Sequence, residues 1–155
     1  MEFIEVHGDD REIIKGILDL ENNTFGDNGA IDVWTLKPFV RYGKVFALLE
    51  NDVVVSAIEF IHKFDSKEMY LFGVSTREEF RGRGCAKELI NRSTEYFKEK
   101  GMEKISLTVA PENKSAVGLY KKMGYIVENI QNSEYGDGVD RFYICLLYTS
   151  PSPRD

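Results

Sequence analysis

The chain has 155 residues, with a mass of 17.8 kDa, which is the size of one ordinary domain. Hydrophobic residues make up 43% and charged residues 30%, and with 10 Phe and 8 Tyr these values exclude a disordered or low-complexity chain. The net charge of −6 and the pI near 5.1 argue against a general nucleic-acid binder, so any anion-binding site must be local.

The first third of the chain predicts a strand, a helix, a loop and a second helix. Apolar residues at 3–6 indicate a short strand, and Asp9 or Asp10 then caps a helix. The segment Asn22–Ala30 is rich in Gly and Asn and is typical of a loop. The segment Asp32–Tyr42 has an apolar face that contains Pro38, which predicts a short or kinked helix.

The middle of the chain predicts a hairpin, a third strand and an amphipathic helix. Lys44–Glu50 and Asp52–Ile61 are rich in β-branched and aromatic residues, and the turn Asn51-Asp52 predicts that they pair antiparallel. Met69–Ser75 is the next strand. A helix with one apolar face begins after Gly84 and ends at Gly101.

The last third predicts a buried strand over Lys104–Val109 and a helix that Asn113 opens and Gly124 closes. Two strands follow, over Tyr125–Glu128 and Arg141–Ile144. Neither a repeat nor a linker divides the chain, so we expect one domain over residues 1–144.

Residues Cys145–Asp155, CLLYTSPSPRD, change character abruptly and carry no packing pattern. One reading frame of a transposase-type sequencing adapter encodes the same string. We therefore predict that residues 145–155 are a non-native, adapter-derived tail and that native C-terminal residues are missing. A natural disordered C-terminus is the alternative. The apolar start of the segment, residues 145–148, has a composition that allows it to extend the preceding strand.

The two cysteines, Cys85 and Cys145, are too few for a disulfide framework or a cysteine-based zinc site, which favours a reducing compartment. The N-terminal MEFIEVHGDD has neither the basic nor the apolar region of a signal peptide. No apolar run approaches the roughly 18 residues of a membrane span. We therefore expect a cytoplasmic protein with no metal and with neither a membrane nor a nucleic acid as partner.

The segment Arg81-Gly82-Arg83-Gly84-Cys85-Ala86 lies between a predicted strand and a predicted helix. Its glycines let the backbone approach a ligand, the helix N-terminus adds partial positive charge, and the arginines add full charge. These features together indicate a phosphate cradle. A tight turn with solvated arginines is the alternative. A dinucleotide-binding turn is disfavoured because its third glycine is absent.

Three segments of the chain, Leu71–Ala86, Leu107–Ala116 and Leu119–Tyr125, resemble the GNAT family of acetyl-CoA-dependent N-acetyltransferases. The matching motifs are Arg81-x-x-Gly84-x-Ala86, Asn113-x-x-Ala116 and Tyr120-x-x-x-Gly124-Tyr125. The resemblance covers residues 1–144. It implies an α/β (α+β) fold with a mixed, mostly antiparallel sheet of six to seven strands and about four helices.

The resemblance also implies roles for individual residues. Val74 would offer backbone groups to the pantetheine arm of acetyl-CoA, Asn113 would bond that arm or a water beside it, and Tyr120 would face the thioester sulfur and protonate the departing thiolate. The pyrophosphate would be held by the six residues of the cradle (Arg81, Gly82, Arg83, Gly84, Cys85 and Ala86). The alternatives are a core aromatic for Tyr120 and a plain helix cap for Asn113.

A primary ammonium must lose a proton before its nitrogen can attack, so the reaction needs a base. Glu68 lies where some members of the family keep a general-base glutamate. A solvated carboxylate at a strand end is the alternative reading of Glu68. Other candidates are an ordered water held by Tyr70 and Glu59, and a contribution from Tyr135. The remaining candidates by residue type are His7 and His62.

We therefore predict an N-acetyltransferase that moves an acetyl group from acetyl-CoA to a primary amine by direct attack in a ternary complex. A non-catalytic acyl-CoA or phosphate-ligand sensor with the same fold is the alternative. The acceptor is a small-molecule or peptide amine, and Asp32–Tyr42 and Asn129–Val139 are expected to flank it. We expect a monomer or a homodimer.

Overall fold

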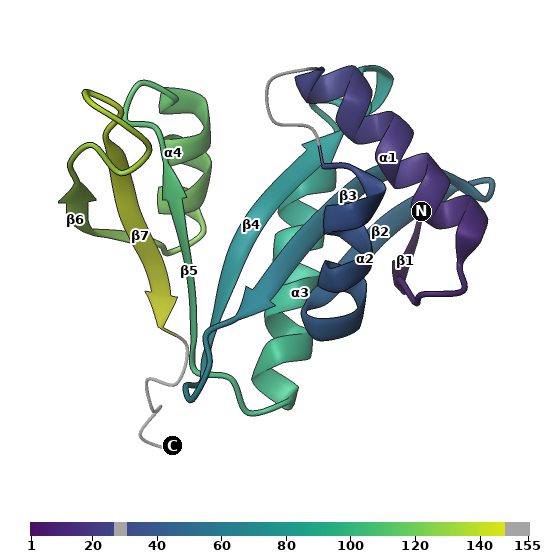
Figure 1. Ribbon diagram of the computed structural model, residues 1–155, viewed down its shortest axis with the longest axis horizontal. Coiled ribbons are helices and arrows are strands. Elements are labelled where there is room, and N and C mark those ends of the chain that lie inside the picture. Colours follow the sequence, from purple (N-terminus) through teal and green to yellow (C-terminus); the bar gives the residue numbers. More distant parts are fainter. Residues whose placement is uncertain (27–30, 148–155) are drawn as a thin grey trace. The chain divides into compact units, whose positions relative to one another are not determined.

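The computed structural model describes residues 1–26 and 31–147 (Figure 1). It divides into two compact units. Unit 1 comprises Met1–His62 and Leu71–Tyr96, and unit 2 comprises Lys63–Tyr70 and the chain from Phe97 onward. Strand β4, Glu68–Thr76, contributes its first three residues to unit 2 and the others to unit 1.

Unit 1 is built on strands covered by helices on both faces (Figure 1). Helices α1 and α2 contact β2 and β3 on one face, and α3 lies on the other. The elements are β1 (Glu2–Glu5), α1 (Arg11–Phe25), α2 (Val33–Tyr42), β2 (Lys44–Glu50), β3 (Val53–His62), the end of β4, a short 3-10 helix (Glu78–Phe80) and α3 (Cys85–Glu99).

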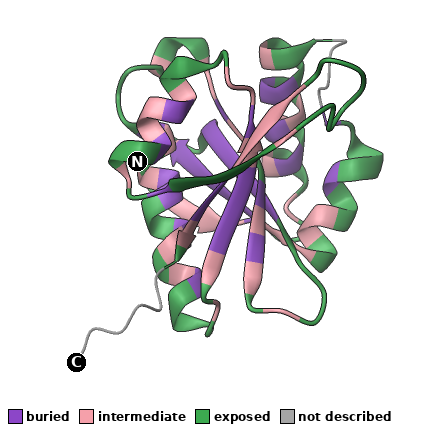
Figure 2. Ribbon diagram, turned by 90° about the vertical axis from the view of Figure 1, so that its left-hand side faces the viewer, coloured by how far each residue is buried: buried purple, intermediate pink, exposed green. Residues whose placement is uncertain are grey.

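Successive side chains of β2 point to opposite faces of the sheet, so this strand contributes to the packing on both faces of unit 1. Val45, Ala47 and Leu49 belong to the core cluster that includes Ile14, Ile17 and Leu20 of α1. Phe46 points to the opposite face, where its ring packs 5.1 Å from that of Tyr96 on α3. Figure 2 shows the buried residues along the strands and exposed residues on the helices.

The turn between β2 and β3 confirms the predicted hairpin. Asn51 and Asp52 both have positive φ, 52° and 67°, the backbone of a turn whose twist matches that of paired strands. The strands pair antiparallel with Ala47 opposite Ala57. The predicted short second helix is also confirmed as α2, which Asp32 caps by accepting a 3.0 Å hydrogen bond from the Thr35 amide.

The loop predicted over Asn22–Ala30 is wrong at its start, because α1 continues to Phe25. The Thr24 hydroxyl donates a 2.8 Å hydrogen bond to the Leu20 carbonyl, so this polar group is satisfied within the helix. Gly26 then ends the helix with φ 57°, and its backbone N–H donates a hydrogen bond to the Asn22 carbonyl. Residues 27–30 of the predicted loop lie outside the described residues.

Unit 2 contains the start of β4 together with β5 (Lys104–Val109), α4 (Lys114–Lys122), β6 (Ile126–Gln131) and β7 (Arg141–Leu147). The start of β4 pairs parallel with β5, and the β5–β7 and β6–β7 pairs are antiparallel. The strand order over the described residues is β1-β2-β3-β4-β5-β7-β6. The predicted mixed, mostly antiparallel sheet is therefore confirmed, with seven strands and four α-helices in the described part of the chain.

The last two strands run further than the sequence predicts. Strand β6 begins one residue later than expected, because Tyr125 is buried beside Tyr120, and it continues to Gln131. Strand β7 includes Cys145, whose side chain is buried, and extends to Leu147 opposite Lys104. The rest of the predicted tail, residues 148–155, lies outside the described residues. Among the described helices none combines the length and the apolar character needed to cross a membrane.

Candidate active site

The predicted phosphate cradle forms the turn that leads into α3 in unit 1. Gly82 and Gly84 have φ values of 79° and 78°, a region that residues with a side chain rarely adopt. Apart from each glycine and its two chain neighbours, no described atom lies within 4 Å of the position that a Cβ would take on Gly82 or Gly84. Both backbone segments therefore face open space at the N-terminus of a 15-residue helix.

The charged residues of the turn lie beside that open space. Arg81 and Arg83 are exposed, and the Arg83 guanidinium stacks 4.7 Å from the centroid of the Phe80 ring. Arg81 is anchored by a 3.3 Å hydrogen bond from its Nε to the Thr76 carbonyl. Two held guanidinium groups and a helix N-terminus fit a diphosphate, which carries charge on several oxygens.

Cys85 and Ala86 are the first two residues of α3, so their backbone amides lie at the helix N-terminus. The Cys85 thiol is turned inward, 3.7 Å from the Phe80 carbonyl, and burial raises its pKa, with the Glu88 carboxylate adding to the rise. A buried thiol of this kind is unreactive. Any contact of Cys85 with a phosphate therefore comes from its amide, as it does for a residue at a helix N-terminus.

Val74 lies on β4 between Gly73 and Ser75 and is partly buried. The neighbouring Phe72 is half exposed, and its ring packs edge-on against Phe39 of α2 with centroids 4.8 Å apart. Helix α2, which we predicted to lie beside the acceptor, therefore abuts the strand that carries Val74.

Asn113 and Tyr120 lie at the two ends of α4 in unit 2. Asn113 caps the helix, since its Oδ1 accepts a 3.1 Å hydrogen bond from the Ala116 amide. The structure thus places Asn113 as a cap, and its Nδ2 retains two donors for a second contact. Tyr120 is 5% exposed and packs edge-on against Tyr125, and burial raises its pKa to about 12.

Glu68 is held by hydrogen bonds within unit 2. Its Oε2 accepts from the Ser106 hydroxyl at 2.6 Å and from the Tyr143 hydroxyl at 2.9 Å. Burial acts to raise the pKa of Glu68, but these two bonds and the charges of Lys104 and Lys63 outweigh it, so the pKa is lowered. A lowered pKa weakens Glu68 as a proton acceptor at neutral pH.

The tyrosines that the sequence offers as alternatives belong to one connected group in unit 2. The Tyr70 hydroxyl lies 3.2 Å from Thr108 Oγ1, which accepts a hydrogen bond from Arg141. The Arg141 guanidinium stacks over the Tyr135 ring, 5.6 Å from its centroid. The two histidines, His7 in the β1–α1 loop and His62 at the end of β3, are both exposed.

Sequence reasoning missed a buried carboxyl, Glu21, which is 2% exposed on α1. Its position four residues after Ile17 and seven after Ile14 places it on the buried face of the helix. That spacing was the available signal, and the expected end of the helix near Asn22 obscured it. Ser75 of β4 donates a 3.0 Å hydrogen bond to Glu21 Oε2.

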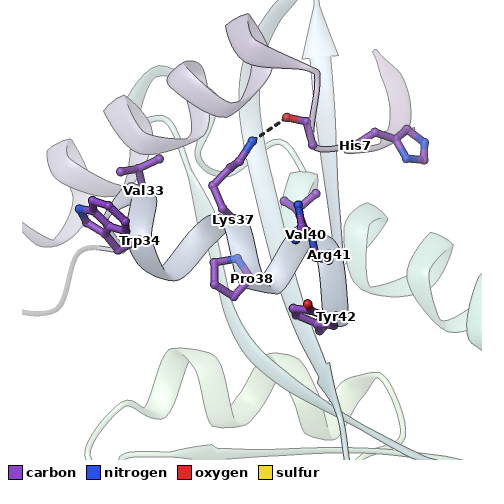
Figure 3. Close-up of a pocket in the computed structure, with 9 residues that line it drawn as sticks. His7, Val33, Trp34, Lys37, Pro38, Val40, Arg41 and Tyr42 are labelled. Carbon is purple, nitrogen blue, oxygen red and sulfur yellow. Dashed lines mark hydrogen bonds between the residues drawn. The ribbon is translucent and has the colours of Figure 1, made fainter.

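A pocket of about 740 Å³ lies along α2 in unit 1 (Figure 3). Trp34, Pro38 and Tyr42 are among the residues that line it, and the Lys37 ammonium donates a 2.7 Å hydrogen bond to the Gly8 carbonyl. The His7 imidazole points away from Lys37 in the same view. The predicted acceptor segment Asp32–Tyr42 therefore carries a pocket with a mostly apolar lining.

The predicted site residues fall into two groups. Val74 and the six cradle residues belong to unit 1, where the 3-10 helix Glu78–Phe80 joins β4 to the cradle. Glu68, Asn113 and Tyr120 belong to unit 2, in which α4 brings Asn113 and Tyr120 onto one helix. Within the described residues no group of three or more His, Cys, Asp or Glu side chains is arranged to hold a metal ion.

Comparison with known proteins identifies the family to which this chain belongs. A model of the acetyltransferase (GNAT) family matches residues 14–125. The chain belongs to the GNAT family of acetyltransferases. Acetyl-CoA is the acetyl donor of that family, and this chain matches less than half of the length of the first curated relatives.

Individual curated relatives are also acetyltransferases, and they match a smaller part of this chain than the family model does. The chain is 37% identical over 75 residues to N-alpha-acetyltransferase MAK3 of Arabidopsis thaliana, a match that spans 48% of this chain and 38% of that protein. Among solved structures, aminoglycoside 6'-acetyltransferase type Ii has a TM-score of 0.84 at 17% identity, covering 99% of this chain and all of that one. A chain of the NatC complex bound to Gag peptide and CoA has a TM-score of 0.77 at 20% identity and covers 95% and 99%. These structures establish the predicted GNAT fold.

Proposed function

We propose that this chain transfers the acetyl group of acetyl-CoA to a primary amine by direct attack of the amine nitrogen. The observation that carries the proposal is the cradle at the start of α3, with two glycines at positive φ under open space and two arginines beside it. Acetyl-CoA supplies the activated acetyl thioester. The chain supplies binding, orientation and proton transfer.

Each residue has a distinct task in this proposal. The cradle binds the diphosphate through backbone amides and through Arg81 and Arg83. The backbone N–H near Val74 stabilises negative charge on the carbonyl oxygen as the C–N bond forms. The C–S bond then breaks, and Tyr120 donates its phenolic proton to the thiolate. A phenol held neutral by burial keeps its proton up to a pH of about 12, so the donor is present throughout the working range.

The acceptor in this proposal is the α-amino group of a peptide or protein N-terminus. The Arabidopsis relative is an N-alpha-acetyltransferase, and one structural neighbour was solved with a peptide. The apolar pocket on α2 offers a site for a first side chain of the acceptor. We propose that the chain acts in the cytoplasm, as a monomer or a homodimer.

The test is a thiol-release assay with acetyl-CoA and a panel of amines. The panel contains peptides that differ only in their first residue, the same peptides with a blocked α-amine, a polyamine and an aminoglycoside. The proposal expects turnover with free peptides and none with blocked ones. Binding of CoA without turnover on any amine would support the non-catalytic sensor instead.

A further inference from the structure

Two buried carboxyl groups lie over β4 within unit 1. Glu21 of α1 receives the hydrogen bond from Ser75 described above. Glu59 of β3 is fully buried, and its Oε1 lies 3.2 Å from the position that a Cβ would take on Gly73. Gly73 and Ser75 are two residues apart on one strand, so they share a face and both carboxyls lie over it.

The two carboxyls differ in how they are satisfied. Among the described residues no hydrogen-bond partner reaches either oxygen of Glu59. Burying an ionised carboxylate without donors or a cation is too costly to persist, so the group keeps its proton instead. Burial raises the pKa of Glu59 well above its usual value, and the charge of Glu21 adds to the rise.

Glu21 is the better site for the negative charge of the two. Burial raises its pKa as well, but the hydrogen bonds from Ser75 and from the backbone of Ile31 oppose that rise. Within residues 1–26 and 31–147, the charge that acts on Glu59 is that of Glu21. Its register partner on β2 is Val45, and the charged residues of α2, Lys37 and Arg41, are exposed.

We propose that Glu21 and Glu59 form a pair that shares one proton and that takes up, at Gly73, the proton lost by the acceptor amine. The inference deepens the proposed function and rests on it for the identity of the proton donor. Glu59 and Glu21 act through a bound water and not by touching the amine, so both are positioning residues. The step assigns a use to the only described carboxylate oxygens that are buried without a partner.

The proton balance is simple. The ammonium nitrogen loses one proton, its lone pair attacks the thioester carbonyl, and the proton passes through the water to the charged carboxyl of the pair. Both carboxyls are then neutral, and the extra proton returns to solvent after the product leaves. A side chain at residue 73 would press on Glu59 Oε1, so glycine at this position keeps the approach open.

The raised pKa of the pair suits this task better than the lowered pKa of Glu68. A proton acceptor works best when its pKa lies near the working pH, because it is then unprotonated and still basic. Burial raises the pKa of both Glu21 and Glu59, and the charge of Glu21 adds to the rise at Glu59. The hydrogen bonds and lysine charges around Glu68 do the opposite.

The first experiment tests the shared proton without a substrate. The full chain is labelled with ¹³C at the glutamate carboxyls, and their chemical shifts are followed from acid to alkaline pH. We expect one carboxyl to titrate well above the others, and Glu59→Gln to remove that signal. A spectrum in which every glutamate titrates in the ordinary acid range would overturn the shared proton, whatever the enzyme acetylates.

The second experiment tests the role in catalysis by the pH profile of kcat with the best amine. Glu59→Gln should lower kcat by roughly 10²–10⁴-fold and move the acid limb to lower pH, with unchanged affinity for CoA. Ser75→Ala removes a hydrogen bond that lowers the pKa of Glu21. The acid limb of this variant's kcat profile should therefore move to higher pH. The exposed Glu95→Gln is the matched control and should leave the profile unchanged.

The Ser75→Ala profile and the titration of the parent protein decide the question if Glu59→Gln does not fold. The inference would be overturned if the acid limb of the kcat profile stayed at the same pH in Ser75→Ala and Glu59→Gln and disappeared only in Glu68→Gln. That result would assign the base to Glu68. A shared proton seen by NMR in a protein that acetylates no amine would refute the proposed function and leave the carboxyl pair standing without a catalytic use.

Discussion

The hydroxyl of Ser106 donates a 2.6 Å hydrogen bond to the carboxylate of Glu68 between the parallel strands β4 and β5. The bond accounts for part of the lowered pKa of Glu68. It gives that residue a structural task which is independent of any catalytic one.

Glu68→Gln is expected to destabilise the fold by about 1–3 kcal/mol at neutral pH, because the neutral amide accepts these hydrogen bonds less strongly. A folded pKa below the unfolded value contributes stability that is present above the unfolded pKa, near 4.5, and is lost as pH falls through the folded pKa. Denaturant unfolding at a series of pH values should show this acid loss in the parent and not in the variant. The exposed pair Glu103–Lys67 provides the control, since Glu103→Gln should change little.

Gly84→Asp is expected to weaken CoA binding strongly, because it places a negative charge in the cradle and a side chain at a φ of 78°. Calorimetry with CoA measures the effect. Gly101→Asp is the matched control: Gly101 also has positive φ, 89°, and open space, but it ends the turn after α3. Both variants carry similar backbone strain, so equal losses of CoA affinity would contradict the assignment of the cradle.

Tyr120→Phe keeps the packing against Tyr125 and removes only the hydroxyl, so CoA affinity should hold. The turnover number should fall by roughly 10²–10⁴-fold if the phenol is the acid. With the pKa of Tyr120 raised to about 12, the parent should show no alkaline loss from this group near pH 10. Tyr125→Phe is the control for loss of a buried hydroxyl. Equal turnover in Tyr120→Phe and the parent would make Tyr120 a packing residue.

Trp34→Ala and Tyr135→Ala are expected to change the preference among acceptor amines while CoA affinity stays near normal. The Trp34 side chain is 83% exposed and lines the α2 pocket, so its removal should cost little stability. Relative kcat/KM over the peptide panel is the measurement. Phe64→Ala removes an aromatic of similar exposure, 86%, from the β3–β4 turn and should leave the preference unchanged. Loss of CoA binding with an intact preference would contradict this assignment.

Deletion of Thr149–Asp155 is expected to change neither the melting temperature nor the activity. We propose that residues 1–144 form the native acetyltransferase domain and that residues 145–155 are an adapter-derived tail, whose first three residues extend strand β7. The deleted segment contains two prolines and no apolar residue, so its sequence offers nothing to bury. Thermal unfolding of the full and shortened chains is the measurement, and a drop of several degrees would show that the segment packs.

Local chemistry in the sequence determined most of the elements and the cradle. Asn51-Asp52 tolerates the positive φ of a hairpin turn, and Gly82 and Gly84 do the same before α3, so these features depend on neighbours in the chain. The capping residues Asp32 and Asn113 act within three residues of themselves. Such short-range preferences can be recognised without knowledge of the fold.

Only the tertiary structure decided the protonation of the carboxyl groups. Glu59 and Glu68 both lie in strand-like segments, yet Glu59 is enclosed beside Glu21 while Glu68 receives bonds from Ser106 and Tyr143. These partners are distant in sequence, Glu21 by 38 residues and Tyr143 by 75, and a pKa depends on the burial and charges that folding brings together. The sequence therefore identified Glu59 and Glu68 as candidates and missed Glu21, and the packing of α1, β3 and β5 gave these carboxyl groups their different surroundings.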